Sequence, residues 1–150
     1  MDSTILATIV LGALGILITG YYSRHTKKIS DEQLLKQLFT EFNERYSILN
    51  DHLKEVENKY KTLSELEKSK DADFLKKNVI DYFSLCAEEY YWYKHKKRID
   101  KLIWVSWQSG MNYWYNKVPA IKDLWNIEVK ENGKLTYYIE EGENGFFQEY

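Results

Sequence analysis

The chain has 150 residues, enough for one domain and an additional terminal segment. Hydrophobic residues make up 44% and charged residues 29%, which is typical of a folded protein and argues against a disordered one. The net charge of −2 argues against a nucleic-acid-binding protein, and the single cysteine excludes a disulfide framework and a cysteine-rich zinc site.

The N-terminal region contains an uncharged stretch at residues 4–22, TILATIVLGALGILITGYY. A helix of this length, at about 1.5 Å per residue, extends for roughly 28 Å, close to the thickness of a hydrocarbon core. A cleaved signal peptide would need a basic start and a small-residue cleavage site, which this sequence lacks. We therefore predict a transmembrane anchor at residues 4–22 and a basic juxtamembrane linker at residues 23–29.

The charges on either side of this stretch predict its orientation. Arg24, Lys27 and Lys28 follow it, whereas only Asp2 precedes it. The positive-inside rule then predicts a single-pass protein of the inner membrane, with its N-terminus outside and its C-terminal domain in the cytoplasm. Small residues on one helical face form a candidate transmembrane packing face: Thr4, Thr8, Gly12, Gly15 and Thr19.

A long helical pattern follows the linker. Ser30 and Gln33 have the spacing of a capping box, and apolar residues then recur every three or four positions from Leu35 to Leu63. This seam resembles that of a coiled coil. We predict that it packs on the next helix of the same chain, with a homodimer as the alternative.

Three shorter helices are expected next. Asp71 or Asp73 caps the first, Asp100 caps the second, and Pro119 suits the first turn of the third. The predicted fold class is therefore all-α, with the transmembrane helix followed by a small antiparallel helical bundle at residues 30–126.

The last predicted region, residues 127–150, has a different pattern. Alternating apolar and polar residues around Asn132 and Gly133 predict a short β-hairpin, although the last helix can instead continue to Val129. The remainder is acidic and contains glycine, as is typical of a flexible tail. Its glutamates have the charge needed to fold back on the basic turn at residues 94–101.

Motifs for catalysis are not found in the sequence. GxGxxG, phosphate-loop, nucleophile-elbow and paired Glu-x-x-His patterns are all missing. Cys86 lies on an apolar stripe without a neighbouring histidine, which is typical of a buried structural cysteine. We predict a non-enzymatic protein without catalytic residues, cofactor or metal.

Aromatic residues gather in one part of the chain, where all five tryptophans lie between Trp92 and Trp125. They either fill the core or reach the surface, where aromatic side chains often anchor interfaces. The candidate interaction surface combines aromatic residues with a basic turn: Tyr91, Trp92, Trp104, Lys96, Lys97 and Arg98. The turn itself is read as a solvated connection, with anionic lipid or single-stranded nucleic acid as alternatives, and no nucleic-acid partner is predicted.

Several segments resemble a known family. The N-terminal stretch, LFTEFNERYSILND, DYFSLCAEEYYWYK, RIDKLIWVSWQSGMNYWY and VPAIKDLW are similar to a family of small bacterial single-span membrane proteins with a cytosolic helical domain of unknown function. The resemblance covers most of residues 1–126 and implies the same architecture. It implies no catalytic residue, and some relatives are suspected of roles in defence against phage.

The functional expectation is a membrane-anchored protein whose cytosolic helical domain mediates protein–protein interaction without catalysis. The expected partners are the membrane and either another protein or a second copy, with anionic lipid as a further contact. Two alternatives are an oligomerising membrane effector, for example in phage defence, and an enzyme whose site forms only in three dimensions.

Overall fold

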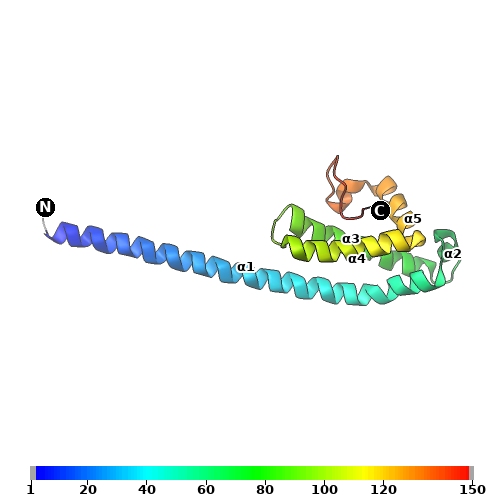
Figure 1. The fold of residues 1–150 in the computed structure, drawn as a ribbon, viewed down its shortest axis with the longest axis horizontal. Helices are drawn as coiled ribbons and strands as arrows, with labels where there is room; N and C mark the ends of the chain where they lie inside the picture. Colours follow the sequence, from blue (N-terminus) through cyan, green and yellow to red (C-terminus); the bar gives the residue numbers. More distant parts are fainter. Residues whose placement is uncertain (1–2, 149–150) are drawn as a thin grey trace. The chain divides into compact units, whose positions relative to one another are not determined.

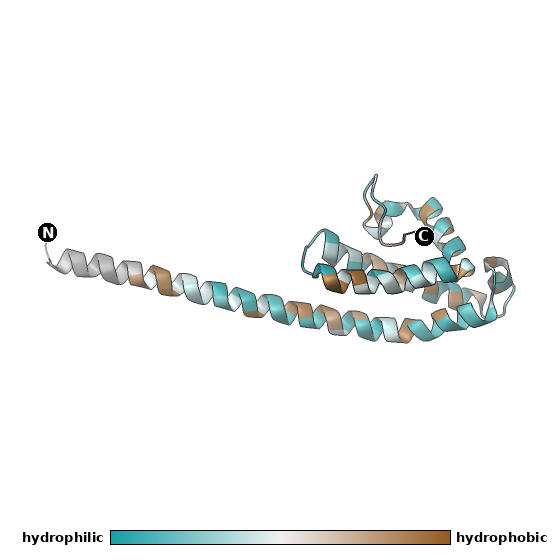
Figure 2. Ribbon diagram, viewed as in Figure 1, coloured by the Kyte–Doolittle hydropathy of each residue, from teal (hydrophilic) through white to brown (hydrophobic). Residues whose placement is uncertain are grey.

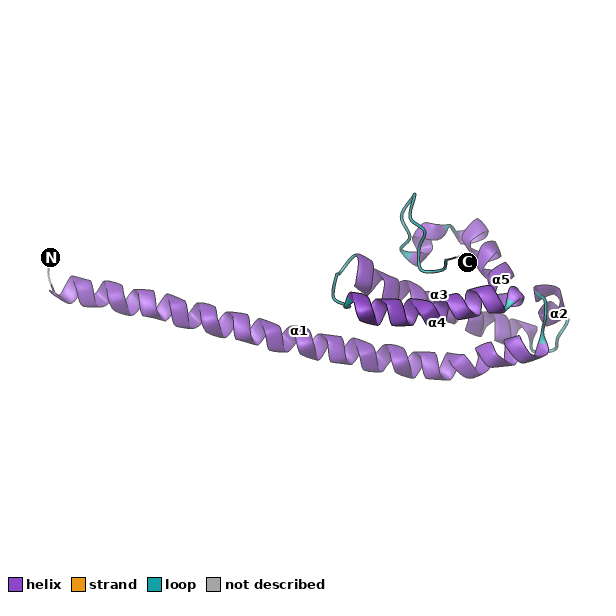
Figure 3. Cartoon of the chain, in the orientation of Figure 1, coloured by secondary structure: helices purple, strands orange, loops and turns teal. Residues whose placement is uncertain are grey.

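The computed structural model describes the backbone of residues 3–148 and the side chains of residues 14–148. Regular secondary structure in this range is entirely helical (Figure 3). The elements are α1 (Ser3–Lys59), α2 (Leu63–Glu67), α3 (Ala72–Lys94), α4 (Lys101–Lys117), α5 (Pro119–Asn132) and the 3-10 helix η1 (Lys134–Tyr137) (Figure 1). The chain divides into two units, residues 1–38 and 39–150, and α1 contributes to both.

The first unit is a length of helix without a packed core around its first described side chains. Every side chain from residue 14 to residue 30 is exposed, and Lys28 pairs with Glu32 one turn later at 3.9 Å. Helix α1 continues through Ser30, so the predicted capping box is not used as a helix start. The reason is that the preceding turn already supplies the carbonyl groups to which the amides after Ser30 donate.

The predicted transmembrane helix is contradicted. Within the described part of the chain, no helix combines the length and the apolar character that a membrane crossing requires. Among the coloured residues of α1 in Figure 2, apolar ones come first and a polar stretch follows them. The predicted inner-membrane location and single-pass orientation depended on this anchor and are contradicted with it.

The second unit buries the apolar seam of α1 against helices of the same chain, as predicted. Phe42, Leu53 and Val56 are almost fully buried. The ring of Tyr46 lies 6.3 Å from that of Tyr82 on α3, and the ring of Phe42 lies 5.7 Å from that of Trp107 on α4. The buried seam therefore forms part of the hydrophobic core and is not available to a coiled-coil partner.

The starts of the next helices follow the predicted local signals. The backbone amide of Leu102 donates to the Asp100 side chain at 2.7 Å, and Pro119 occupies the first turn of α5. Asp71 is the N-cap of α3 but makes no side-chain capping bond. Asp100 and Pro119 therefore have the predicted roles, whereas Asp71 has the predicted position without the predicted bond.

The predicted β-hairpin is wrong, since residues 3–148 contain no strand. Helix α5 continues past Val129 to Asn132, and Gly133 ends it with a φ of 78°, a value that glycine adopts easily. Residues beyond η1 pack on the core and do not form a flexible tail there: Phe146 and Phe147 are buried, with ring centroids 5.1 and 4.9 Å from that of Trp125. Gly145 permits this path, because a Cβ added there would meet Ile139 at 2.6 Å.

Candidate functional site

The predicted interaction surface loses one of its aromatic residues to the core. Trp104 is only 4% exposed, and its ring stacks on that of Tyr93 with centroids 4.7 Å apart and planes 5° from parallel. The ring of Tyr90 lies 5.7 Å away on another side. The first turn of α4 therefore directs Trp104 against the end of α3, and it cannot anchor a partner at the surface.

The remaining predicted surface residues lie around the end of α3. Tyr91 and Trp92 are partly exposed, and Lys96, Lys97 and Arg98 are exposed. Tyr91 is nevertheless engaged within the chain, with its ring 4.9 Å from that of Tyr138 and the Lys96 ammonium 5.4 Å from its ring centre. Part of the predicted interaction surface is therefore already covered by contacts within the chain.

Acidic residues of the C-terminal segment bind the same region. Glu143 accepts a hydrogen bond from the Tyr90 hydroxyl at 2.8 Å and pairs with Lys94 at 3.1 Å, and both interactions lower its pKa. Glu140 lies 3.8 Å from the ring of His95. The predicted return of the acidic segment to the basic turn is confirmed for these two glutamates, while Glu149 lies outside the described residues.

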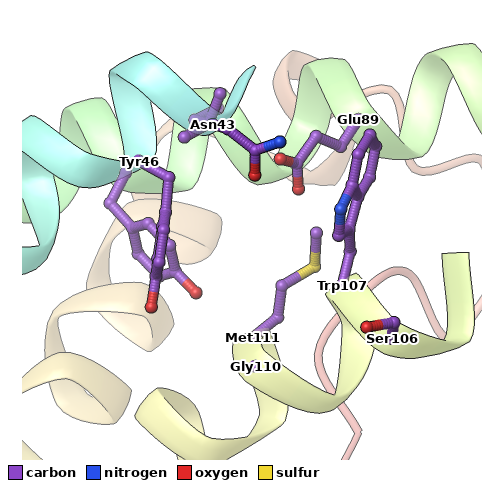
Figure 4. A pocket seen from close by; sticks show the side chains of 9 residues that line it. Asn43, Tyr46, Glu89, Ser106, Trp107, Gly110 and Met111 are labelled. Carbon is purple, nitrogen blue, oxygen red and sulfur yellow. The ribbon is translucent and has the colours of Figure 1, made fainter. Parts of the chain in front are cut away.

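A cavity of about 160 Å³ lies between α1, α3 and α4 of the second unit (Figure 4). Tyr46 of α1, Tyr82 of α3 and Trp107 and Met111 of α4 form much of its apolar wall. Other lining residues are exposed, so the cavity opens to solvent on their side: Asn43, Ser106 and Gly110. The packing of three helices leaves a small space with both aromatic and polar walls.

Glu89 places a carboxyl group at the wall of this cavity. Figure 4 shows its side chain reaching toward Asn43 and Met111, with Trp107 beside it. Glu89 is 8% exposed, and burial raises its pKa to about 8, an effect that the charge of Arg45 opposes and that of Glu88 reinforces. A carboxyl group in this setting holds a proton at neutral pH.

The nearest cation to Glu89 is committed to other acids. Arg45 donates to both carboxylate oxygens of Glu88, at 2.5 and 2.9 Å, and lies 3.6 Å from Glu41. The Glu88 hydrogen bond is also the main cause of the raised pKa of Arg45. Arg45 therefore influences Glu89 through space without forming an ion pair with it.

Sequence reasoning missed Glu89, although a signal was present. Cys86 and Tyr90 belong to the buried stripe of α3, and Glu89 lies three positions after Cys86 on the same face. A carboxylate at a core-facing helical position is unusual and marks a candidate site. Cys86 itself is fully buried with a strongly raised pKa, caused mainly by burial, as its apolar position predicted.

Among residues 14–148, no group of three histidine, cysteine, aspartate or glutamate side chains is placed to hold a metal ion. Of the predicted transmembrane packing face, Thr4, Thr8 and Gly12 lie outside the described side chains, and Gly15 and Thr19 are exposed.

Comparisons of the chain with protein-family models, with curated proteins and with solved structures gave no match. The geometry of the chain itself is therefore the basis on which a function can be proposed.

Proposed function

We propose that this protein is a non-enzymatic interaction module that assembles copies of itself through its N-terminal unit. The observation that carries the proposal is the exposure of an uncharged helical segment, residues 14–22. Ile16, Leu17, Tyr21 and Tyr22 are between 64% and 75% exposed, and Leu14 and Ile18 are about half exposed. A helix that is apolar on several sides needs another surface to cover it.

A second copy of the chain is the occupant that fits this segment best. The segment carries no charged side chain with which a foreign partner would be selected, and identical apolar segments bury each other when they associate. Gly15 provides a place for close approach, since a Cβ added there would meet no atom within 4 Å. Small residues spaced three or four apart on one face favour such helix contacts.

Association through the N-terminal unit would concentrate the second unit, residues 39–150. Joining modules raises the effective concentration of each at any shared target. The partly exposed Tyr91 and Trp92, together with the basic residues that follow them, are then a candidate surface for a further protein partner. In this proposal the protein acts by gathering binding surfaces and performs no reaction.

The test is the mass of the purified full-length chain by light scattering over roughly a hundredfold range of concentration. The expected mass is a multiple of the 18.0 kDa monomer that falls on dilution. Gly15→Leu should weaken association about tenfold, because its side chain separates the facing helices.

Gly20→Leu is the matched control. A Cβ at Gly20 also meets no atom within 4 Å, but Gly20 lies on a different face of the helix from Gly15. Because leucine favours helix more than glycine, neither variant should unfold the segment. A monomer at every concentration, or equal effects of the two variants, would contradict self-association through this face. If the chain were monomeric and a foreign protein were recovered with it in stoichiometric amount, that protein would be the partner of this segment instead of a second copy.

A further inference from the structure

The carboxyl group of Glu89 points to a ligand that self-association does not explain. Glu89 is more than nine-tenths buried and lines the cavity between α1, α3 and α4. Within the described part of the chain no group donates a hydrogen bond to its carboxyl oxygens. These oxygens are not fully enclosed atoms, because they face the open space of the cavity, where a ligand from outside the chain can contact them.

Among the described residues, Arg45 acts on Glu89 through its charge, but no lysine or arginine forms an ion pair with it. Arg45 is held by the two oxygens of Glu88 and by Glu41. A divalent metal ion needs several oxygen, nitrogen or sulfur ligands, and the described side chains form no such cluster around Glu89. A single carboxylate is better suited to an organic cation, because the atoms around its charge are covalently bonded and need no further ligands from the protein.

The remaining walls suit the carbon substituents of such a cation. Trp107, Tyr46 and Tyr82 present aromatic rings, and Met111 presents a polarisable thioether. Aromatic faces attract alkylammonium groups, and sulfur packs well against them. The cavity measures about 160 Å³, close to the ~150 Å³ of an apolar cavity that admits benzene.

We propose that this cavity binds a small organic ammonium ion, with the charge beside Glu89 and the alkyl groups against Trp107 and the two tyrosines. The open side formed by Asn43, Ser106 and Gly110 provides the route of entry. The recognised class is a methylated or primary amine of about the size of benzene.

Binding of this ion is linked to loss of a proton. The groups that face Glu89 are Arg45 and Tyr46 from α1 and Tyr82, Cys86 and Glu88 from α3, whereas the lining residues from α4 are not ionisable near neutral pH. The carboxyl proton passes to solvent buffer as the ammonium ion enters. Affinity should therefore rise with pH up to about pH 8, the pKa of Glu89.

The experiment is calorimetric titration of the full chain with choline and with its uncharged carbon isostere, 3,3-dimethylbutan-1-ol. Choline should bind, with release of a proton that is measured from the dependence of the heat on buffer. The isostere should bind at least tenfold more weakly. Glu89→Gln should weaken choline binding at least tenfold, whereas Glu44→Gln, which makes the same replacement at an exposed position, should leave it unchanged.

Gly110→Leu provides a second variant that keeps Glu89 intact. A Cβ at Gly110 meets no atom within 4 Å, and Gly110 is exposed at the open side of the cavity, so a larger side chain can extend there. It should reduce choline binding while preserving the fold. Failure of choline to bind the unmodified chain at millimolar concentration would overturn the proposal. So would equal binding of choline and its isostere, or binding that survives both Glu89→Gln and Gly110→Leu.

Discussion

Truncation of Phe146 tests whether the end of the chain is part of the core. Phe146 is fully buried, and its ring lies 4.7 Å from that of Phe147, 5.1 Å from that of Trp125 and 6.0 Å from that of Tyr90. Its backbone carbonyl also accepts a hydrogen bond from the Gln108 side chain at 3.2 Å. The segment is therefore held by packing and by a polar contact to α4.

The expected cost of Phe146→Ala follows from this burial. Replacing a buried phenylalanine by alanine lowers the free energy of unfolding by about 3–5 kcal/mol, through lost burial and the cavity that remains. Because Phe146 lies in a segment without regular secondary structure, its surroundings can relax, and we expect the lower end of this range, about 3 kcal/mol. A flexible acidic tail would instead give no measurable change.

The assay is urea unfolding at a fixed protein concentration, followed by tryptophan fluorescence. Leu135→Ala is the matched control, because Leu135 is 74% exposed and its truncation should change the free energy of unfolding by less than about 0.5 kcal/mol. A loss below about 0.5 kcal/mol for Phe146→Ala, equal to that of the control, would refute the packed arrangement of residues 139–148.

Two further predictions concern a helix cap and a buried acid. Asp100→Ala should lower the free energy of unfolding by about 1 kcal/mol, because it removes the bond to the Leu102 amide, while Asp71→Ala, which removes no capping bond, should have little effect in the same urea assay. The raised pKa of Glu89 means that the folded state holds its proton more tightly than the unfolded state. The contribution of Glu89 to stability should therefore be fully present below about pH 4.5 and be lost as pH rises to about 8. The loss should approach 1.4 kcal/mol per pH unit at most, and Glu89→Gln should abolish this component in unfolding curves measured from pH 5 to pH 8; an unchanged slope would contradict it.

The sequence by itself determined the features that depend on near neighbours along the chain. The cap at Asp100, the first turn at Pro119 and the periodic seam of α1 were predicted correctly, because each involves residues within one or two turns. Local signals gave a wrong prediction where the same residues suit two different structures. Asn132 and Gly133 suit a hairpin turn, but Gly133 also ends a helix, and α5 takes the second use.

Tertiary structure decided everything that depends on what covers a side chain. Trp104 belongs to the core because the end of α3 meets it, and the acidic segment is ordered because Phe146 and Phe147 reach Trp125. Glu88 and Glu89 are adjacent residues of the same type, yet Glu88 pairs with Arg45 and Glu89 is buried beside a cavity. Burial sets the pKa and the binding chemistry of a carboxyl group, and burial exists only once α1, α3 and α4 have packed together.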